Sequence, residues 1–363
     1  MDAPKGTALP ARDGAKSESA LRRALLGWYR RNARWLPWRA TKDPYAIWVS
    51  EVMLQQTQVA TVVPYYRRFL RAFPNLTSLA RAPRERVLEL WAGLGYYRRA
   101  RHLHLAAQTL ARKFDATFPR DYRLARTLPG IGDYTARAVL SLAYDLPYYV
   151  LDGNVGRVVA RLRALRGSLN QPAFRRAVEG VLDRLLSRRQ PGNFNQAVME
   201  LGQAVCLPRA PRCPACPIRT WCRAYRLGRP ESYPSPRSRR ARESLHLATG
   251  VVHRDHKVML VRGLDDGLLE GLWNFPSAFG KSQSDAVARL KEKLTGLAQS
   301  QVRIGEPFAE LRHGITYRSM RVHLYPVEFD GKNFPSSAHW LRVARLKNSA
   351  TSQLARKVGA CLA

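Results

Sequence analysis

The spacing of apolar residues divides the chain into two regions of different texture. From Leu21 to about Leu227, apolar residues recur every three or four positions with Pro or Gly at the breaks, which is the pattern of amphipathic helices. After a Pro-, Ser- and Arg-rich stretch at 229–242, the apolar segments become short, β-branched and partly alternating, as in strands. The pattern predicts an all-α domain at 20–228, a linker at 229–242 and an α+β domain at 243–350.

The two ends of the chain read differently from these domains. Residues 1–19 are polar, rich in Gly, Pro and Ala, and lack the apolar stretch of a secretory signal, so we expect a disordered tail. We also expect a C-terminal tail at 351–363. The length of 363 residues suffices for two domains that each bury a core. No apolar run has the length of a bilayer span.

Charge is the strongest global signal in the composition. The chain has 61 Lys and Arg against 27 Asp and Glu, a formal net charge of +34. Such a field attracts polyanions at long range, which makes nucleic acid the first partner to consider. Most of the basic residues are arginine, a bias that genome base composition also produces, so charge by itself indicates a partner and no chemistry.

Four of the five cysteines fall in one loop, CLPRAPRCPACPIRTWC (206–222), with the spacing C-x6-C-x2-C-x5-C. Disulfides explain this poorly because nothing in the sequence indicates export. Four thiolates so close together suit a soft metal centre, and the spacing alone leaves tetrahedral zinc and an iron–sulfur cluster both open. The candidate ligands are Cys206, Cys213, Cys216 and Cys222.

A glycine-containing turn precedes a helix at LPGIGDYTARAVLS (128–141). Gly130 and Gly132 let the backbone approach an anion closely, and the amides of the first helical turn then point at it. An ordinary helix–turn–helix shares this feature. On a basic protein the turn indicates a helix–hairpin–helix that grips a DNA phosphate without reading sequence. Further along, LDGNVGRV places Asp152 after an apolar run and Asn154 where it can cap the next helix.

Taken in order, the hairpin, the LDGNVGRV segment and the cysteine loop resemble the helix–hairpin–helix DNA glycosylases of the endonuclease III superfamily. Within it, SEVMLQQTQVATVVPYY (50–66) and WAGLGYYRRARHLH (91–104) resemble the adenine glycosylases of the MutY family. The resemblance covers about 21–225 and continues more weakly beyond. It implies a helical glycosylase fold with a 4Fe–4S cluster on the four cysteines, an α+β Nudix-like second domain, and double-stranded DNA as substrate.

The resemblance assigns a general acid to Glu51, which would protonate a flipped adenine at N7. We place Glu51 in the first turn of its helix, with Ser50 as the N-cap. The role needs a carboxyl group that stays protonated near neutral pH, and hence apolar surroundings. Trp48, Val49 and Val52 are the apolar neighbours in sequence.

A second carboxylate follows from the same resemblance. Asp152 would be ionised and would stabilise or attack the sugar, with Asn154 orienting it and a water. Tyr134 stands where bifunctional relatives have a lysine that forms a Schiff base with the sugar. Tyrosine cannot form that imine, so the resemblance implies a glycosylase that removes a base without cutting the strand.

Further positions match recognition elements of the family. Arg39 would reach the adenine pocket, and Leu54, Gln56 and Thr57 would enter the gap left by the base. Tyr96 would wedge beside the opposite base, offsetting part of the cost of extruding the nucleotide. Each has a structural alternative, in packing or as a surface charge.

The second domain lacks the acidic residues of a hydrolase. A Nudix hydrolase holds magnesium with several glutamates on one helix, whereas ARLKEKLTGL contains only Glu292. We therefore expect recognition of 8-oxoguanine rather than hydrolysis. RHGITYRS (312–319) stands where the family has a Phe-Ser-His-like loop, with Thr316 in place of the serine and Tyr317 in place of the histidine, which leaves the contacts of this loop open.

The favoured function is a monofunctional adenine glycosylase of base excision repair that acts on adenine opposite 8-oxoguanine or guanine. One alternative is an endonuclease III-like pyrimidine glycosylase with lyase activity, against which Tyr134 argues. The other is a DNA-binding iron–sulfur protein without turnover, against which the presence of both Glu51 and Asp152 argues. We expect a monomer in the bacterial cytoplasm, associated with the nucleoid and without a membrane partner.

Overall fold

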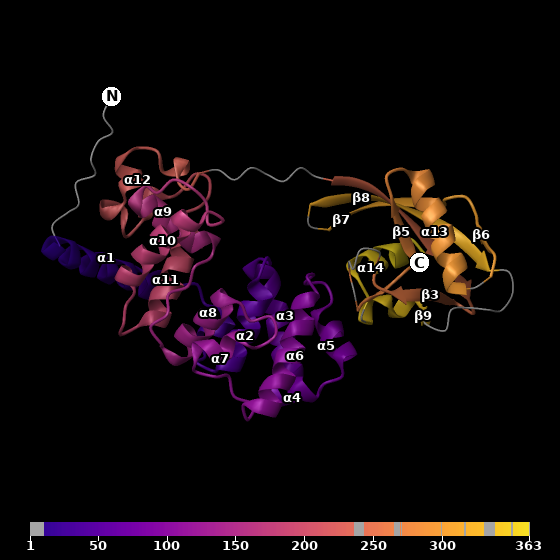
Figure 1. The fold of residues 1–363 in the computed structure, drawn as a ribbon, viewed down its shortest axis with the longest axis horizontal. Helices are drawn as coiled ribbons and strands as arrows, with labels where there is room; N and C mark the ends of the chain where they lie inside the picture. The colour runs from indigo at the N-terminus through magenta and orange to yellow at the C-terminus, as the bar shows by residue number, and fades with distance from the viewer. Residues whose placement is uncertain are drawn as a thin grey trace. The chain divides into compact units, whose positions relative to one another are not determined.

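The computed structural model has helices in its earlier part and two β-sheets in its later part (Figure 1). It describes residues 11–235, 243–264, 269, 271–298, 300–315, 317–329, 338–349 and 351–362. The chain forms two compact units, Met1–Leu70 with Thr109–Ser238, and Arg71–Gln108 with Arg239–Ala363. Residues 71–108 lie inside the helical region of the sequence, yet they group with the second unit. The domain boundaries derived from the sequence stay a prediction.

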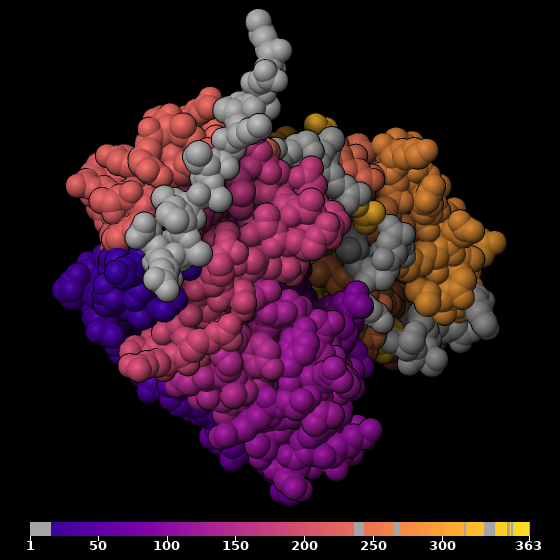
Figure 2. Space-filling view, turned by 60° about the vertical axis from the view of Figure 1, so that its left-hand side comes forward, coloured from indigo at the N-terminus to yellow at the C-terminus, as the bar shows by residue number. Residues whose placement is uncertain are grey.

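The first unit is built from helices. They are α1 (Ala11–Asn32), η1 (Pro37–Arg39), α2 (Pro44–Leu54), α3 (Val59–Ala72), α7 (Tyr122–Arg126), α8 (Asp133–Tyr144), α9 (Gly153–Arg163), α10 (Pro172–Leu185), α11 (Pro191–Ala204), η2 (Cys213–Ala215), η3 (Arg219–Trp221), α12 (Arg223–Arg226) and η4 (Pro230–Ser232). Helix α11 packs against α1, α8 and α9, and α2 packs against α8. In the space-filling view the indigo surface of α1 meets the pink surface of α10 and α11 (Figure 2).

Helix α2 is buried along almost its whole length, so it is apolar on nearly every side. Asp43 caps it, accepting hydrogen bonds from the amides of Tyr45 (3.0 Å) and Ala46 (3.3 Å), and Pro44 occupies its first turn. The helix therefore begins about two turns before Glu51. The expected N-cap at Ser50 is wrong, because the Ser50 hydroxyl lies within the helix and donates to the carbonyl of Ile47 (2.7 Å).

Helix α1 begins at Ala11, so the expectation of a disordered tail is wrong for residues 11–19. Glu18 pairs with Arg163 (3.3 Å) and Arg184 (3.5 Å). Arg22 donates to the carbonyl of Leu185 (2.9 Å). These partners lie far along the chain, and a local sequence pattern does not reveal them.

The second unit contains short helices and two sheets. They are α4 (Leu76–Arg81), α5 (Arg84–Trp91), α6 (Arg98–Lys113), β1 (Glu243–Val251), β2 (His253–Arg254), β3 (Lys257–Arg262), β4 (Trp273–Asn274), β5 (Ser277–Gly280), α13 (Gln283–Ala298), β6 (Val302–Ile304), β7 (Ala309–Ile315), β8 (Arg318–Phe329), β9 (His339–Arg342), η6 (Val343–Asn348) and α14 (Gln353–Ala360). One sheet has the order β5-β1-β8-β6 with β7 also on β8, and the other has the order β2-β3-β4 with β9 on β3.

The sheets and helices of this unit share two cores. Leu247 and Val322 of the first sheet pack with Leu260 of the second and with Leu354 of α14. On the other face of the first sheet, α13 supplies Leu290 and its apolar neighbours. Because α14 is part of the first core, the expectation of a C-terminal tail at 351–363 is wrong for that helix.

No helix in the described part of the chain is long and apolar enough to cross a membrane.

The cap of α2 offers a test of what positions Glu51. Asp43→Ala removes the acceptor for two amides of the first turn and should lower the free energy of unfolding by about 1 kcal/mol, measured by urea denaturation. Asp43→Asn keeps an acceptor and should lose at most a few tenths of that value. Equal stability of the alanine and aspartate forms would show that the cap is dispensable.

Candidate active site

A cavity of about 970 Å³ opens in the first unit. It is lined by the ends of several helices, α2, α8, α9 and α11 among them. Both predicted carboxylates line it, together with most of the other residues singled out from the sequence: Arg39, Glu51, Leu54, Gln56, Thr57, Tyr134, Asp152 and Asn154.

The carboxyl group of Glu51 is buried in this cavity, and the residue is 5% exposed. Burial raises its pKa to about 7 and is the largest cause. A hydrogen bond from Tyr134 lowers the pKa, the charge of Asp152 raises it, and Arg39 lowers it. The apolar neighbours Trp48, Val49 and Val52 are buried, as the sequence predicted. Glu51 is thus a carboxyl group that can carry a proton near neutral pH.

Asp152 is the N-cap of α9, with its side chain fixed from two directions. Oδ1 accepts from the amide of Val155 (2.7 Å) and Oδ2 accepts from the side-chain amide of Asn154 (3.1 Å). The expected capping role of Asn154 is wrong, because Asn154 lies inside the helix and orients the cap residue instead. Arg157 in turn donates to Asn154 Oδ1 (2.9 Å), so the carboxylate is held by a chain of side chains.

Tyr134 follows the hairpin on the first turn of α8, and its hydroxyl is buried between Glu51 and α11. It hydrogen-bonds to Glu51 and lies 3.5 Å from the sulfur of Met199. Burial, followed by the charges of Glu51 and Asp152, raises the pKa of Tyr134 well above its ordinary value. The hydroxyl therefore stays protonated and acts as a hydrogen-bond donor in the cavity.

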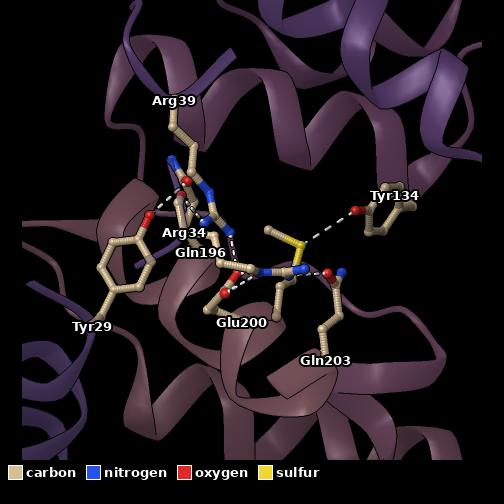
Figure 3. A network of polar contacts seen from close by, with 8 residues as sticks. Tyr29, Arg34, Arg39, Tyr134, Gln196, Glu200 and Gln203 are labelled. Atoms are coloured by element: carbon tan, nitrogen blue, oxygen red, sulfur yellow. Dashed lines mark hydrogen bonds and ion pairs between the residues drawn. The ribbon is translucent and has the colours of Figure 1, made fainter. Parts of the chain in front are cut away.

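Opposite Tyr134, a second buried glutamate binds two arginines (Figure 3). Glu200 of α11 accepts from Arg39 (2.7 Å) and from Arg34 (3.0 Å). Burial raises its pKa, but the hydrogen bonds from Arg34 and Arg39 outweigh burial and lower it below the ordinary value. Arg39 also lies over the ring of Tyr29, 5.5 Å from its centroid. Glu200 is therefore held ionised, whereas Glu51 can carry a proton near neutral pH.

The hairpin glycines differ in what their backbone requires. Gly130 has a φ of 74°, which L side chains rarely adopt. Gly132 is the N-cap of α8 with an ordinary φ of −81°, and a Cβ built there would meet nothing within 4 Å. Open space outside its backbone leaves room for another molecule to approach the first amides of α8.

Asp133 fixes the helix behind this hairpin. It accepts from Arg137 at 2.8 Å and lies 3.6 Å from Arg175 of α10. The hydroxyl of Tyr122 also donates to it (2.5 Å). These contacts join α7, α8 and α10 around the turn and keep basic side chains beside it.

The cysteine loop is tied to α9 by two arginines. Arg157 donates to the carbonyl of Cys206 (2.9 Å). Arg161, which is buried, donates to the Cys206 sulfur (3.3 Å) and to the carbonyl of Pro208 (2.9 Å). Burial raises the pKa of Cys216 to about 12, and the charges of the other three thiols of the loop add to that rise. In the described residues no group of three or more His, Cys, Asp and Glu is placed to hold a metal ion.

Tyr96, predicted to wedge beside the opposite base, does not line the cavity. Tyr96 belongs to the second unit, is 42% exposed and has a φ of 49°. Thr316 lies outside the described residues. Gln56, at the cavity, also has a positive φ, 56°. Such backbone is strained in a residue other than glycine, and strain of this kind concentrates at functional sites.

The chain was compared with known proteins. Residues 49–183 match the model of the HhH-GPD superfamily of base excision DNA repair proteins. The adenine DNA glycosylase of Mus musculus is 34% identical over 399 residues, covering 94% of this chain and 77% of the mouse protein. The chain belongs to the adenine DNA glycosylases. That of Buchnera aphidicola from Acyrthosiphon pisum is 33% identical over 270 residues, 74% of this chain and 77% of its own.

Among solved structures, a thermostable thymine-DNA glycosylase is 26% identical to this chain, with a TM-score of 0.54 over 59% of this chain and 99% of that one. It corresponds to the helical fold. The sequence-based prediction of a helix–hairpin–helix glycosylase of the adenine-specific family is confirmed by these matches, as is a helical domain followed by one with sheets.

Sequence reasoning missed one wall of this adenine glycosylase's cavity, although the signal was present. Gln196, Met199, Glu200 and Gln203 recur every three or four residues in the NFNQAVMELGQAV helix, so they share one face. Most of that helix is buried, and a polar stripe on a buried helix indicates a site rather than a core. Gln196, Met199 and Gln203 form the wall, and Arg34, which also lines the cavity, donates to Gln203 (2.7 Å) and to Glu200 (3.0 Å).

The arginine pair gives a test of how Glu51 keeps its proton. Glu200→Gln leaves Arg39, whose charge already lowers the pKa of Glu51, without its counter-charge, which should lower that pKa by about 1 more. The pH above which single-turnover excision slows should fall by the same amount. Asp145→Asn removes a carboxylate from the exposed pair with Lys42 and serves as the matched control. An unchanged profile in Glu200→Gln would contradict the assignment, and thermal unfolding reports any loss of stability separately.

Proposed function

We propose that the chain hydrolyses the N-glycosidic bond of adenine mispaired with 8-oxoguanine or guanine in duplex DNA, and leaves the strand intact. The observation that carries the proposal is the pair of unlike carboxyl groups in one cavity. Glu51 has a pKa of about 7 because it is buried. Asp152 is oriented by two hydrogen bonds. Two carboxyl groups with separate roles are the usual apparatus of glycoside cleavage.

The reaction divides between these groups. Glu51 gives its proton to N7 of the flipped adenine, so the bond between C1′ and N9 breaks with its electron pair on the base. Positive charge develops on the sugar, and the carboxylate of Asp152 stabilises it. A water molecule then adds its hydroxide to C1′ and releases a proton, which restores Glu51. Adenine and an abasic sugar are the products.

Tyr134 restricts the outcome to base removal. Its hydroxyl is buried beside Glu51 and has no amine with which to form an imine. It holds the protonated carboxyl group in place and excludes water from that side. The alternative of a lyase, which needs a lysine nucleophile, has no support at this position.

Recognition of the DNA is shared among other residues in this proposal. The hairpin at Gly130 and Gly132 holds a phosphate on the amides of α8. Gln56 and Thr57, beside the cavity, enter the gap left by adenine. Tyr96 wedges at the opposite base. The second unit reads 8-oxoguanine through Thr316, whose hydroxyl can accept from N7–H or donate to the C8 carbonyl.

Single-turnover excision tests the function. We expect adenine release opposite 8-oxoguanine and guanine and little opposite thymine or cytosine. Glu51→Gln cannot donate the proton and should abolish excision while DNA binding persists, and Asp152→Asn should slow it severely. Above pH 7 the protonated fraction of Glu51, and with it the rate, should fall about tenfold per pH unit.

Other outcomes would favour the alternatives. Release of an oxidised pyrimidine, or abundant borohydride trapping of the wild-type protein on DNA, would indicate a bifunctional pyrimidine glycosylase. Unchanged behaviour of both carboxylate variants would indicate a protein that binds DNA without turnover.

We further propose that Cys206, Cys213, Cys216 and Cys222 hold one 4Fe–4S cluster. The charges of the other three thiols of the loop raise the pKa of Cys216, and the guanidinium of Arg161 donates to the Cys206 sulfur. That donor set fits a group whose ligands are thiolates, because positive charge nearby stabilises partly buried thiolates. The cluster would stabilise the loop and supply no step of the hydrolysis.

The metal content provides the check. Anaerobically purified protein should be yellow-brown and contain about four iron atoms per chain. Cys216→Ser should lose iron and unfold at lower temperature. A colourless protein with one zinc per chain would refute the cluster and support the alternative that the spacing left open.

A further inference from the structure

A second concavity, of about 890 Å³, lies between the C-terminal part of α1, from Ser19 to Arg30, and the turn that joins α10 to α11. We call it the arginine groove. In the described part of the chain its lining has arginines on both walls and one acid, Asp183. The arginines are Arg22, Arg23 and Arg30 on α1, and Arg184, Arg188 and Arg189 on the other side.

The positive charge of the arginine groove is only partly balanced within the protein. Arg188 pairs with Asp183 (3.2 Å) and Arg184 with Glu18 (3.5 Å). The α1 arginines bond to neutral acceptors instead. Arg22 donates to the Leu185 carbonyl (2.9 Å), Arg23 to the Ser19 hydroxyl (2.9 Å) and Arg30 to the Gln190 side chain (3.4 Å).

The groove lies at the end of the first unit away from the hairpin. Helix α10 starts near the hairpin, where Arg175 approaches Asp133 (3.6 Å), and ends at the groove. Its 14 residues span about 21 Å. Helix α11 begins at the groove and meets the C-terminal end of α8, where a Cβ on Gly192 would lie 2.6 Å from the Ser141 carbonyl. A phosphate held by the hairpin amides therefore lies at the opposite end of α10 from the groove.

We propose that the arginine groove binds an extended, acidic segment of a partner protein, independently of the DNA at the active site. The walls already accept carboxylates, those of Asp183 and Glu18. No aromatic residue lines the groove in the described part of the chain, so it lacks the stacking surfaces by which proteins hold single-stranded nucleic acid. Leu26 and Leu186 contribute apolar surface for the stems of the bound side chains.

The length of the arginine groove fits a short extended segment. The α1 wall runs from Ser19 to Arg30, about 17 Å at the rise of an α-helix, which matches about five extended residues. Arginine forks bind carboxylates in a bidentate manner, which suits a row of Asp and Glu side chains pointing to both walls.

Fluorescence anisotropy with a labelled peptide of alternating Asp and Glu tests the proposal on the full chain. Arg23→Glu together with Arg189→Glu, both exposed, reverses one charge on each wall. This pair should weaken peptide binding at least about tenfold. Arg81→Glu together with Arg321→Glu, exposed in the second unit, changes the net charge equally and should leave peptide binding nearly unchanged. Peptide should stay bound when substrate duplex saturates the protein, and excision by the groove variant should match wild type.

Three results would overturn the proposal. Equal weakening in both charge-reversal variants would show that the peptide senses net charge alone. Displacement of the peptide by substrate duplex would place it on the DNA-binding face. Tighter binding of an oligonucleotide than of the peptide, lost in the groove variant, would make the groove a nucleic-acid site. The peptide measurement needs no turnover, so it stands apart from a failure of the proposed excision.

Discussion

The site depends on a carboxyl group that is buried without a cation of its own. Glu51 lines the cavity, whereas Glu200 is buried outside its lining, and burial acts to raise the pKa of both carboxyl groups. Glu200 receives the guanidinium groups of Arg34 and Arg39 and is held ionised. Glu51 receives a hydroxyl, that of Tyr134, and a negative neighbour. The protonated state of the acid is therefore a consequence of where the arginines are bound, as much as of the apolar helix around it.

The second carboxylate depends on a different constraint, the single helix α9. Asp152 is the N-cap of that helix. About one and two turns further along, the same helix carries Arg157 and Arg161, which donate to backbone carbonyls of the cysteine loop. Arg161 is buried, and its guanidinium would lose most of its acceptors without the loop. The loop and the orientation of Asp152 are thus parts of one packed arrangement, although more than fifty residues of sequence separate Asp152 from Cys206.

Sequence reasoning succeeded where a local pattern decides the outcome. Helical periodicity predicted the helices of the first unit, and the residues that the family motifs singled out, Glu51, Tyr134 and Asp152 among them, line one cavity. It failed where distant partners decide: α1 extends back to Ala11 through ion pairs of Glu18 with other helices, and α14 joins a core instead of trailing as a tail. The cap at Asp43 was missed because the motif that drew attention began at Ser50, inside the helix.

The excess of arginine has unequal consequences along the chain. Near the hairpin, Asp133 forms ion pairs with Arg137 and Arg175. Near the cavity, Glu200 forms ion pairs with Arg34 and Arg39. Each of these acids fixes the direction of its guanidinium groups, so the charge there is positioned as well as abundant. At the ends of α8 and α10 that lie away from the hairpin, Arg22, Arg23 and Arg30 of α1 donate hydrogen bonds to neutral acceptors. Positive charge that the described acids do not balance is available to an external acid, which is why the arginine groove, and not the hairpin, is the surface suited to a carboxylate-rich partner.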